Sequence, residues 1–350
     1  MDRAKILLIK MRYIGDVVLT TPLLEAMRAA LPNATFDFLV NKPTAQILAD
    51  QSHINFVHCF DKSKPTTATL RLIGALRREH YDLVVDLTNN DRSMLFTRLS
   101  GAPIRIGFRN KHRLLIRKAY TQVISSNFGR IHTIDHHLKV AEALGLSAVT
   151  RHPSLRVNGR SIEKVRQILS HYKVDVGKGY VVIHHGARRW YKSWPSERFA
   201  IIADLVTEIY GFPVVLIGGE EDRDSAQKIL MKMKHRGVNL AGKIPLRDLP
   251  ALLKMAICLV GNDSAPIHVA TAVNTPVIAL FGPTDARAWG PRRSHDIVIS
   301  VNFPCKPCGH KNINCPLGKN YCMSTIEVGK VWDGVKTIIE QVSMAGRLAK

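Results

Sequence analysis

Short apolar runs alternate with helix-length amphipathic stretches along most of this chain. The apolar runs are 5–10, 35–41, 54–61 and 81–88 in the first half, and 180–187, 213–220, 258–264 and 276–283 in the second. Strands that alternate with amphipathic helices in this way predict parallel βαβ units. The alternation stops once and then restarts, so the sequence predicts an α/β protein with two doubly wound, Rossmann-like domains.

The interruption lies between about residues 146 and 179, where turn-forming residues flank a helical pattern over 161–172. We expect a first domain over 1–160 and a second over 161–324. Residues 325–350 place apolar side chains at helical spacing, which predicts a C-terminal helix that packs onto one of the domains. A chain of 350 residues that is 46% hydrophobic can bury the two cores that this division requires.

The chain is strongly basic, with 50 Lys and Arg against 28 Asp and Glu and a formal charge of +22. Such a charge favours polyanionic partners: nucleic acid, anionic lipid or a phosphorylated substrate. Nucleic acid is disfavoured because no helix-turn-helix, RNA-recognition or zinc-finger signature is present. The sequence contains neither a secretory signal nor an apolar run of about 18 residues. We therefore expect a cytoplasmic protein that is at most peripheral to a membrane.

In open α/β sheets, ligands bind beyond the carboxyl ends of the strands, so the loops that follow the apolar runs hold the candidate site residues. The first loop contains Arg12, then Gly15, which permits a tight turn, and then Asp16 at the start of a helix. Asp16 is either a helix cap or a general base.

Two loops of the second half also carry candidate residues. Around Asp263 and Ser264 a strand ends and a helix begins, and the free N–H groups of a helix start can bind phosphate. The alternative there is ordinary capping, with His268 as a buried core histidine. The loop 184–195 combines Arg188, Arg189 and Lys192 with the aromatic residues Trp190, Tyr191 and Trp194, and could hold an anionic group on an aromatic floor.

Several common motifs are missing from the sequence. It has neither G-x-G-x-x-G after the first strand nor G-x-x-x-x-G-K-[ST], which disfavours dinucleotide enzymes and P-loop NTPases. It also lacks G-x-S-x-G and H-E-x-x-H, which disfavours the hydrolases that use those motifs.

Four stretches together resemble the ADP-heptose:lipopolysaccharide heptosyltransferase family, glycosyltransferase family 9. They are 10–24, 189–195, 261–270 and the cysteine-bearing segment 305–322. The similarity covers almost the whole chain and is greatest to the branch that adds the third heptose of the inner core. It implies a GT-B fold in which the first domain binds the lipopolysaccharide acceptor and the second binds ADP-heptose. It places catalysis in the cleft between the domains, which would close on the substrates.

The resemblance implies a role for two charged residues. Asp16 would deprotonate the acceptor hydroxyl, which attacks the anomeric carbon with inversion, and Lys192 would neutralise the departing diphosphate. Because fixed positive groups can replace a divalent cation and no Asp-x-Asp-like motif follows a strand, we expect neither a catalytic metal nor another cofactor. A GT-B enzyme that uses a different nucleotide sugar is the nearest alternative.

The resemblance also implies a donor site in the second domain. Ser264 and Ala265 would supply backbone N–H groups to phosphate, and Asp263 and His268 would line the pocket. Many relatives carry Gly where this chain has Ala265. The methyl group of Ala265 leaves less room for the backbone to approach a phosphate. A carboxylate among residues 220–222, with Glu221 the first choice over Glu220 and Asp222, would contact the adenosine ribose.

Two further clusters have open interpretations. Arg109, Lys111 and Arg113 belong to a basic segment, 105–118, that together with Arg12 would bind the phosphorylated inner core or the anionic inner-membrane face, or that is simply a solvated basic loop. The second cluster has four cysteines, Cys305, Cys308, Cys315 and Cys322. Their spacing would suit a structural zinc ion, and the alternative is that they are reduced thiols that pack a loop. The remaining two, Cys59 and Cys258, lie in apolar runs and are expected in the core.

Overall fold

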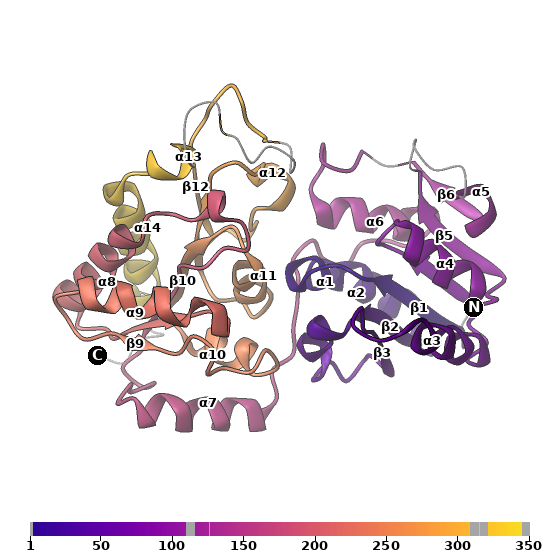
Figure 1. Ribbon diagram of the computed structural model, residues 1–350, viewed down its shortest axis with the longest axis horizontal. Coiled ribbons are helices and arrows are strands. Elements are labelled where there is room, and N and C mark those ends of the chain that lie inside the picture. Colours follow the sequence, from indigo (N-terminus) through magenta and orange to yellow (C-terminus); the bar gives the residue numbers. More distant parts are fainter. Residues whose placement is uncertain (1–2, 110–115, 126, 309–314, 316–320, 345–350) are drawn as a thin grey trace. The chain divides into compact units, whose positions relative to one another are not determined.

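The computed structural model describes residues 3–109, 116–125, 127–308, 315 and 321–344. The chain divides into two compact units, Met1–Leu155 and Arg156–Lys350 (Figure 1). Each unit is built around one parallel sheet of six strands with helices on both faces. The predicted fold class, α/β with doubly wound Rossmann-like domains, is confirmed.

The first unit has the strand order β3-β2-β1-β4-β5-β6. Its strands are β1 Lys5–Lys10, β2 Thr35–Asn41, β3 Phe56–Phe60, β4 Leu83–Asp86, β5 Ile104–Phe108 and β6 Gln122–Ile124. Its helices are α1 Ile14–Val18, α2 Thr21–Ala30, η1 Lys42–Leu48, α3 Thr66–Arg78, α4 Asp91–Leu99, α5 Ile116–Ala119 and α6 Thr133–Ala143. Neighbouring strands are parallel throughout, as the βαβ pattern requires.

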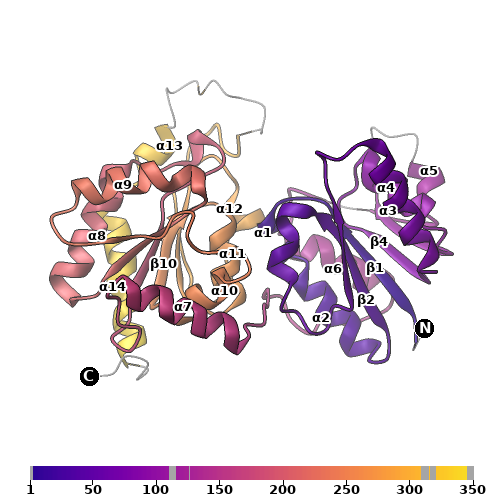
Figure 2. The ribbon, with the colours of Figure 1, turned by 60° about the horizontal axis from the view of Figure 1, so that its bottom comes forward.

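The two faces of β1 have different surroundings (Figure 2). Leu7 and Ile9 point into a core that includes Leu76 of α3 and Phe96 of α4. Because successive side chains of a strand point to opposite faces, Lys10 lies on the other face, the side on which it meets α6. Helix α6 packs against α2 there. The sheet thus presents the side chain of Lys10 to α6 at the carboxyl end of β1.

The second unit repeats this topology, with the order β12-β11-β10-β7-β8-β9. Its strands are β7 Val181–His184, β8 Val214–Ile217, β9 Val238–Asn239, β10 Cys258–Asn262, β11 Val277–Phe281 and β12 Ile297–Ser300. Its helices are α7 Gly159–His171, η2 Trp190–Lys192, α8 Ser196–Tyr210, η3 Glu220–Asp222, α9 Arg223–Lys232, α10 Leu249–Met255, α11 Ala265–Ala272, α12 Ala286–Trp289, α13 Tyr321–Ser324 and α14 Val328–Met344. The last helix, α14, packs on this unit against α8, β10, β11 and β12.

Each sheet has one point at which the strand order reverses, between β1 and β4 in the first unit and between β7 and β10 in the second. The connections on either side of such a point leave the sheet in opposite directions, so a crevice opens beyond the carboxyl ends of the two strands. Ligands of doubly wound folds bind at this switch point. The loops that follow β1, β4, β7 and β10 are therefore the places where functional side chains are expected.

Candidate active site

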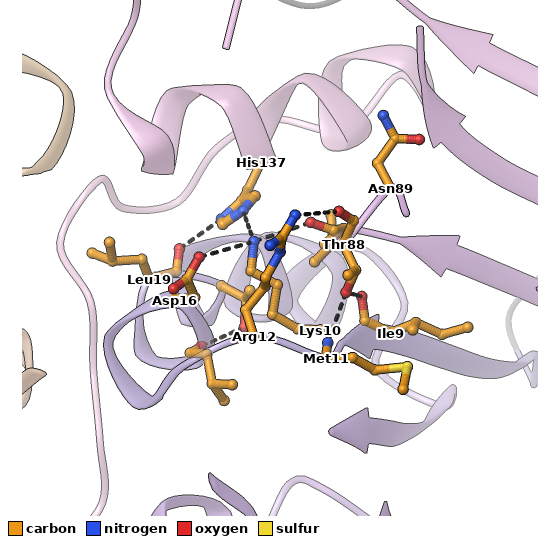
Figure 3. A network of polar contacts seen from close by, with 12 residues as sticks. Ile9, Lys10, Met11, Arg12, Asp16, Leu19, Thr88, Asn89 and His137 are labelled. Carbon is orange, nitrogen blue, oxygen red and sulfur yellow. Dashed lines mark hydrogen bonds and ion pairs between the residues drawn. The ribbon is translucent and has the colours of Figure 1, made fainter. Parts of the chain in front are cut away.

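Asp16 lies at the switch point of the first unit, in the first turn of α1. The N-cap of that helix is Tyr13, so Asp16 is not its capping residue. Its side chain is 18% exposed, and its Oδ1 lies 3.8 Å from the Nζ of Lys10 (Figure 3). The carboxylate accepts no hydrogen bond from any residue that the structure describes. A partly exposed carboxylate whose oxygens are unoccupied in this way can accept a proton from a bound hydroxyl.

Lys10 supplies the positive charge beside Asp16. Its ammonium is buried, donates a hydrogen bond to the carbonyl of Leu87 at 3.0 Å, and lies 3.0 Å from Nε2 of His137 on α6 (Figure 3). Burial lowers the pKa of Lys10 to about 8, and the attraction of Asp16 opposes this lowering. The end of β1 therefore holds a cation in a position that is sheltered from water.

The loop after β4 is tied to the loop after β1. The backbone N–H of Met11 donates to Oγ1 of Thr88 at 2.7 Å, and the guanidinium of Arg12 reaches the carbonyl of Thr88 at 3.5 Å. Asp86, fully buried, accepts hydrogen bonds from the N–H groups of Thr88 and Asn89 and from the hydroxyl of Tyr120. Burial raises the pKa of Asp86. These contacts fix the two loops that border the first switch point.

At the switch point of the second unit, Lys192 and Asp263 form an ion pair. The Nζ of Lys192, on η2, lies 2.6 Å from Oδ2 of Asp263, which follows β10, and the two side chains are 19% and 9% exposed. The sequence placed both residues at a donor site, and the structure brings them together. In this structure the ammonium of Lys192 is therefore paired with the carboxylate of Asp263.

The loop that carries Lys192 is anchored by Trp194. Its indole is buried and donates to the carbonyl of Ile326, and its backbone N–H donates to Oδ1 of Asn262. Asn262 in turn donates to the carbonyl of His185. The prediction that Trp194 helps to form an aromatic floor for an anionic group is therefore wrong, because its indole belongs to the core of the second unit.

The start of α11 faces the end of β7. Ser264 is the N-cap of α11; its hydroxyl donates to the carbonyl of Asn262 and lies 2.9 Å from Nδ1 of His184. Burial lowers the pKa of His184 to about 3, so this imidazole is neutral. Ala265 is the first helical residue, and the first N–H groups of a helix lack an acceptor within it. His268 lies buried in the same helix.

The three carboxylates after β8 differ in their surroundings. Asp222 accepts the N–H of Gly219 at 3.0 Å and fills the space above Gly186 and Gly218, where an added Cβ would come within 2.6 and 2.5 Å of its carboxylate. Glu220 pairs with Arg223 at 3.2 Å. Glu221 is exposed and accepts no hydrogen bond from the described part of the chain. Of the three, Glu221 is the carboxylate left available to a ligand.

The basic segment is described only in part. Arg109 is exposed, and its backbone N–H donates to Ile124 at the edge strand β6. Lys111 and Arg113 lie outside the described residues. Among the helices that the structure describes, none combines the length and the apolar composition needed to cross a bilayer.

The cysteine cluster is also incomplete. Cys308 lies with its Sγ 3.6 Å from the carbonyl of Cys305, and burial raises the pKa of Cys322. Within the described residues, no three His, Cys, Asp or Glu side chains are arranged to hold a metal ion. Of the two cysteines expected in the core, Cys258 is buried, but Cys59 is exposed because β3 is an edge strand.

Several residues of these sites were missed by the sequence analysis. Lys10 had a signal, since a lysine that ends an otherwise apolar strand is unusual and must be satisfied there. His137 and Thr88 had none, because their contacts join residues that lie 127 and 77 positions apart. Asn262 stood inside a quoted motif, but its role as the link between the loops after β7 and β10 depends on the tertiary structure.

Comparison with known proteins places this chain in a family. The family model described as Glycosyltransferase family 9 (heptosyltransferase) matches residues 69–319. A lipopolysaccharide heptosyltransferase 3 of Escherichia coli strain K12 is 33% identical over 315 residues, which cover 86% of this chain and 89% of that protein. A second Escherichia coli protein of the same name is 33% identical over 291 residues, 80% and 84% of the two chains.

Solved structures show the same fold. A family 9 glycosyltransferase from Veillonella parvula superposes with a TM-score of 0.85 at 24% identity and covers 97% of both chains. The ADP-heptose lipopolysaccharide heptosyltransferase II of Escherichia coli superposes with a TM-score of 0.80 at 21% identity, over 97% of this chain and 99% of that one. This chain is thus a glycosyltransferase that belongs to glycosyltransferase family 9, the heptosyltransferases.

Proposed function

We propose that this enzyme transfers L-glycero-D-manno-heptose from ADP-heptose to a heptose of the lipopolysaccharide inner core, as a heptosyltransferase III. The names of its relatives at 33% identity support this reaction. The observation in the structure that carries the proposal is the Asp16 carboxylate, which lies at a switch point beside a buried cation and keeps its oxygens unoccupied by the described residues. An alcohol is a poor nucleophile until such a group takes its proton.

The first domain, proposed to span 1–160 and so to include the unit Met1–Leu155, would bind the acceptor. Asp16 accepts the proton of the acceptor hydroxyl as that oxygen bonds to the anomeric carbon of the donor. The bond from the anomeric carbon to the diphosphate breaks at the same time, with inversion, and ADP leaves. Arg12, which is exposed in the loop that leads into α1, is placed to bind a phosphate of the inner core.

The second domain, proposed to span 161–324 within the unit Arg156–Lys350 and to carry a C-terminal helix over 325–350, would bind ADP-heptose. The diphosphate of the donor replaces Asp263 as the partner of the Lys192 ammonium. Lys192 then neutralises the charge that develops on the leaving group. The N–H groups of Ser264 and Ala265, at the N-terminus of α11, add a positive dipole end. Asp263 and His268 line the pocket, and Glu221 accepts hydrogen bonds from the ribose. The proposed reaction uses these fixed charges and neither a metal nor a cofactor.

The acceptor is anchored in a membrane, so we propose that the enzyme works peripherally at the cytoplasmic face of the inner membrane. Arg109, Lys111 and Arg113 would attract the anionic surface or the phosphorylated core. The proposal includes no nucleic-acid partner, and gel shifts at physiological salt would reveal one.

A donor competition tests the reaction directly. Purified protein is incubated with truncated lipopolysaccharide that bears two heptoses and with ADP-heptose, UDP-sugars or GDP-sugars in parallel, and the acceptor mass is recorded. A gain of one heptose with ADP-heptose alone is the expected result. Gain from another nucleotide sugar would establish the alternative GT-B transferase, and no gain from a folded protein with any donor would reject the proposed acceptor.

A further inference from the structure

The protons around Lys10 can be assigned from the contacts of His137 and from its burial. Nδ1 of His137 lies 3.0 Å from the carbonyl oxygen of Leu19, which can only accept, so Nδ1 carries the hydrogen. Burial lowers the pKa of His137 well below its usual value, so the ring is neutral. Nε2 is then a bare acceptor, and Lys10 must donate to it.

This assignment leaves one ammonium hydrogen of Lys10 without a close acceptor among the residues that the structure describes. The first goes to the carbonyl of Leu87 and the second to Nε2 of His137, both at 3.0 Å. Figure 3 shows that the remaining side of the ammonium faces Asp16. At 3.8 Å the contact is too long for a hydrogen bond but short enough for strong Coulomb attraction in a site sheltered from water.

We propose that Lys10, oriented by His137, is a positioning residue that attracts the Asp16 carboxylate and keeps it aimed at the acceptor hydroxyl; this inference rests on the proposed role of Asp16 as the base. The distance of 3.8 Å between Nζ of Lys10 and Oδ1 of Asp16 matters for this role. A direct hydrogen bond would occupy an oxygen that the hydroxyl needs and would weaken it as a base, whereas an ammonium one step farther away attracts the carboxylate and leaves its lone pairs open.

The groups around Lys10 make its interaction with Asp16 sensitive to pH. Asp16 on α1 and Asp86 on β4 favour the ammonium, while Arg12 and burial oppose it. The facing histidines of α6, His136 and His137, are neutral because burial lowers the pKa of both. With the pKa of Lys10 at about 8, the ammonium is lost through the range just above neutrality. The rate of heptose transfer is therefore expected to fall on the alkaline side of about pH 8.

Four variants separate positioning from packing: Lys10→Met, Lys10→Arg, His137→Leu and His137→Gln. Lys10→Met is expected to lower kcat by about thirtyfold, a share of what a positioned base contributes, and to abolish the alkaline fall in rate. Lys10→Arg is expected to retain most activity and to move the fall beyond pH 10, because a guanidinium does not deprotonate there. His137→Leu is expected to cost about tenfold, and His137→Gln, whose amide oxygen can accept from Lys10, less.

The controls separate this role from others. Lys139→Met removes another lysine, one that lies on α6 and pairs with Glu142, and is expected to leave kcat and the pH profile unchanged. The KM for ADP-heptose is expected to stay within twofold in every variant. If Lys10→Met keeps kcat within threefold, keeps the alkaline fall, or raises only the KM for the acceptor, the inference is wrong. Thermal unfolding identifies a misfolded variant, in which case Lys10→Arg and His137→Leu decide.

A titration without substrate tests the same pair independently of the reaction. With lysines labelled at Cε, the resonance of Lys10 is assigned by its loss in Lys10→Arg and followed against pH by NMR. Asp16→Asn is expected to lower the pKa of Lys10 below its wild-type value, because the attraction that opposes burial is removed. An unchanged titration would overturn the coupling even if the protein were shown to use another donor or acceptor.

Discussion

The two units share one topology but arrange charge at their switch points in opposite ways. In the first, the cation Lys10 is part of a strand, is buried and is held by protein acceptors, so Asp16 keeps both oxygens unoccupied by the described residues. In the second, the cation Lys192 lies at the end of the short helix η2, is partly exposed and is bonded directly to Asp263 at 2.6 Å. The first arrangement prepares a carboxylate to accept a proton, and the second stores a cation that an anionic ligand can take over.

This contrast shows what the fold determines and what it leaves to individual residues. The reversal of strand order puts the loops after β1 and β4, and after β7 and β10, at equivalent places. Which charged side chain is available to a ligand at these places depends on the residues that contact the cation and the carboxylate. His137 and the Leu87 carbonyl satisfy Lys10, whereas neutral His184 and Asn262 surround the helix start beside Asp263 and add no competing charge.

Removing the proton acceptor of the first unit is expected to have the largest effect. Asp16→Asn keeps the size of the side chain but cannot take a proton at neutral pH, so kcat is expected to fall by roughly a thousandfold with little change in the KM for ADP-heptose. Steady-state transfer to truncated lipopolysaccharide measures it. Glu142→Gln, an exposed carboxylate on α6, is the matched control. A loss below tenfold would mean that another group accepts the proton.

Removing the cation of the second unit is expected to rank next. Lys192→Met is expected to lower kcat by about a hundredfold and to weaken ADP binding, because the charge that develops on the diphosphate loses its partner. Calorimetry with ADP and steady-state kinetics measure the two effects. Lys232→Met, an exposed lysine on α9, serves as the control. If ADP bound more tightly to Lys192→Met, Lys192 would hinder binding of the donor and would not supply a cation to its diphosphate.

The third prediction tests whether the units also differ at a membrane. Neutralising Arg109, Lys111 and Arg113 of the first unit is expected to weaken sedimentation with anionic vesicles by at least tenfold, since each Lys or Arg near such a surface contributes about 1 kcal/mol. A variant of the second unit with the same loss of charge is the control: exposed Lys228, Lys232 and Arg236 changed to Gln. Equal losses in both variants would indicate net charge alone, and no loss in the first would exclude the basic segment as an anchor.

The sequence predicted the fold class well because the apolar runs follow the buried parallel strands closely. Strands β1 and β10, for example, have almost every residue buried, which leaves a continuous apolar signal. Edge strands give weaker information. Strand β3 alternates between buried and exposed residues, and Cys59 therefore faces outward although it stands in an apolar run.

The candidate site could be predicted only where its residues share a short segment. Asp16, Lys192 and Asp263 stand in loops that the strand pattern marks, and the family resemblance then assigned their roles. The partners that tune them come from distant elements: His137 reaches Lys10 from α6, and Trp194 reaches Ile326 near the end of the chain. No spacing in the sequence encodes such contacts, because they follow from the packing of helices on the sheet.

The smallest expected effect concerns the three carboxylates of η3, two of which are held by the protein. Glu221→Gln is expected to raise the KM for ADP-heptose about fivefold at unchanged kcat, because one hydrogen bond from the ribose to a charged acceptor is weakened far from the reacting atoms. Glu220→Gln is the matched control, since its carboxylate already pairs with Arg223. Asp222→Asn is expected to lower the melting temperature instead, because Asp222 accepts the N–H of Gly219 in a space that Gly186 and Gly218 leave for it. If Glu220→Gln raised KM and Glu221→Gln did not, Glu220 would be the ribose contact and would have to leave Arg223 when the donor binds.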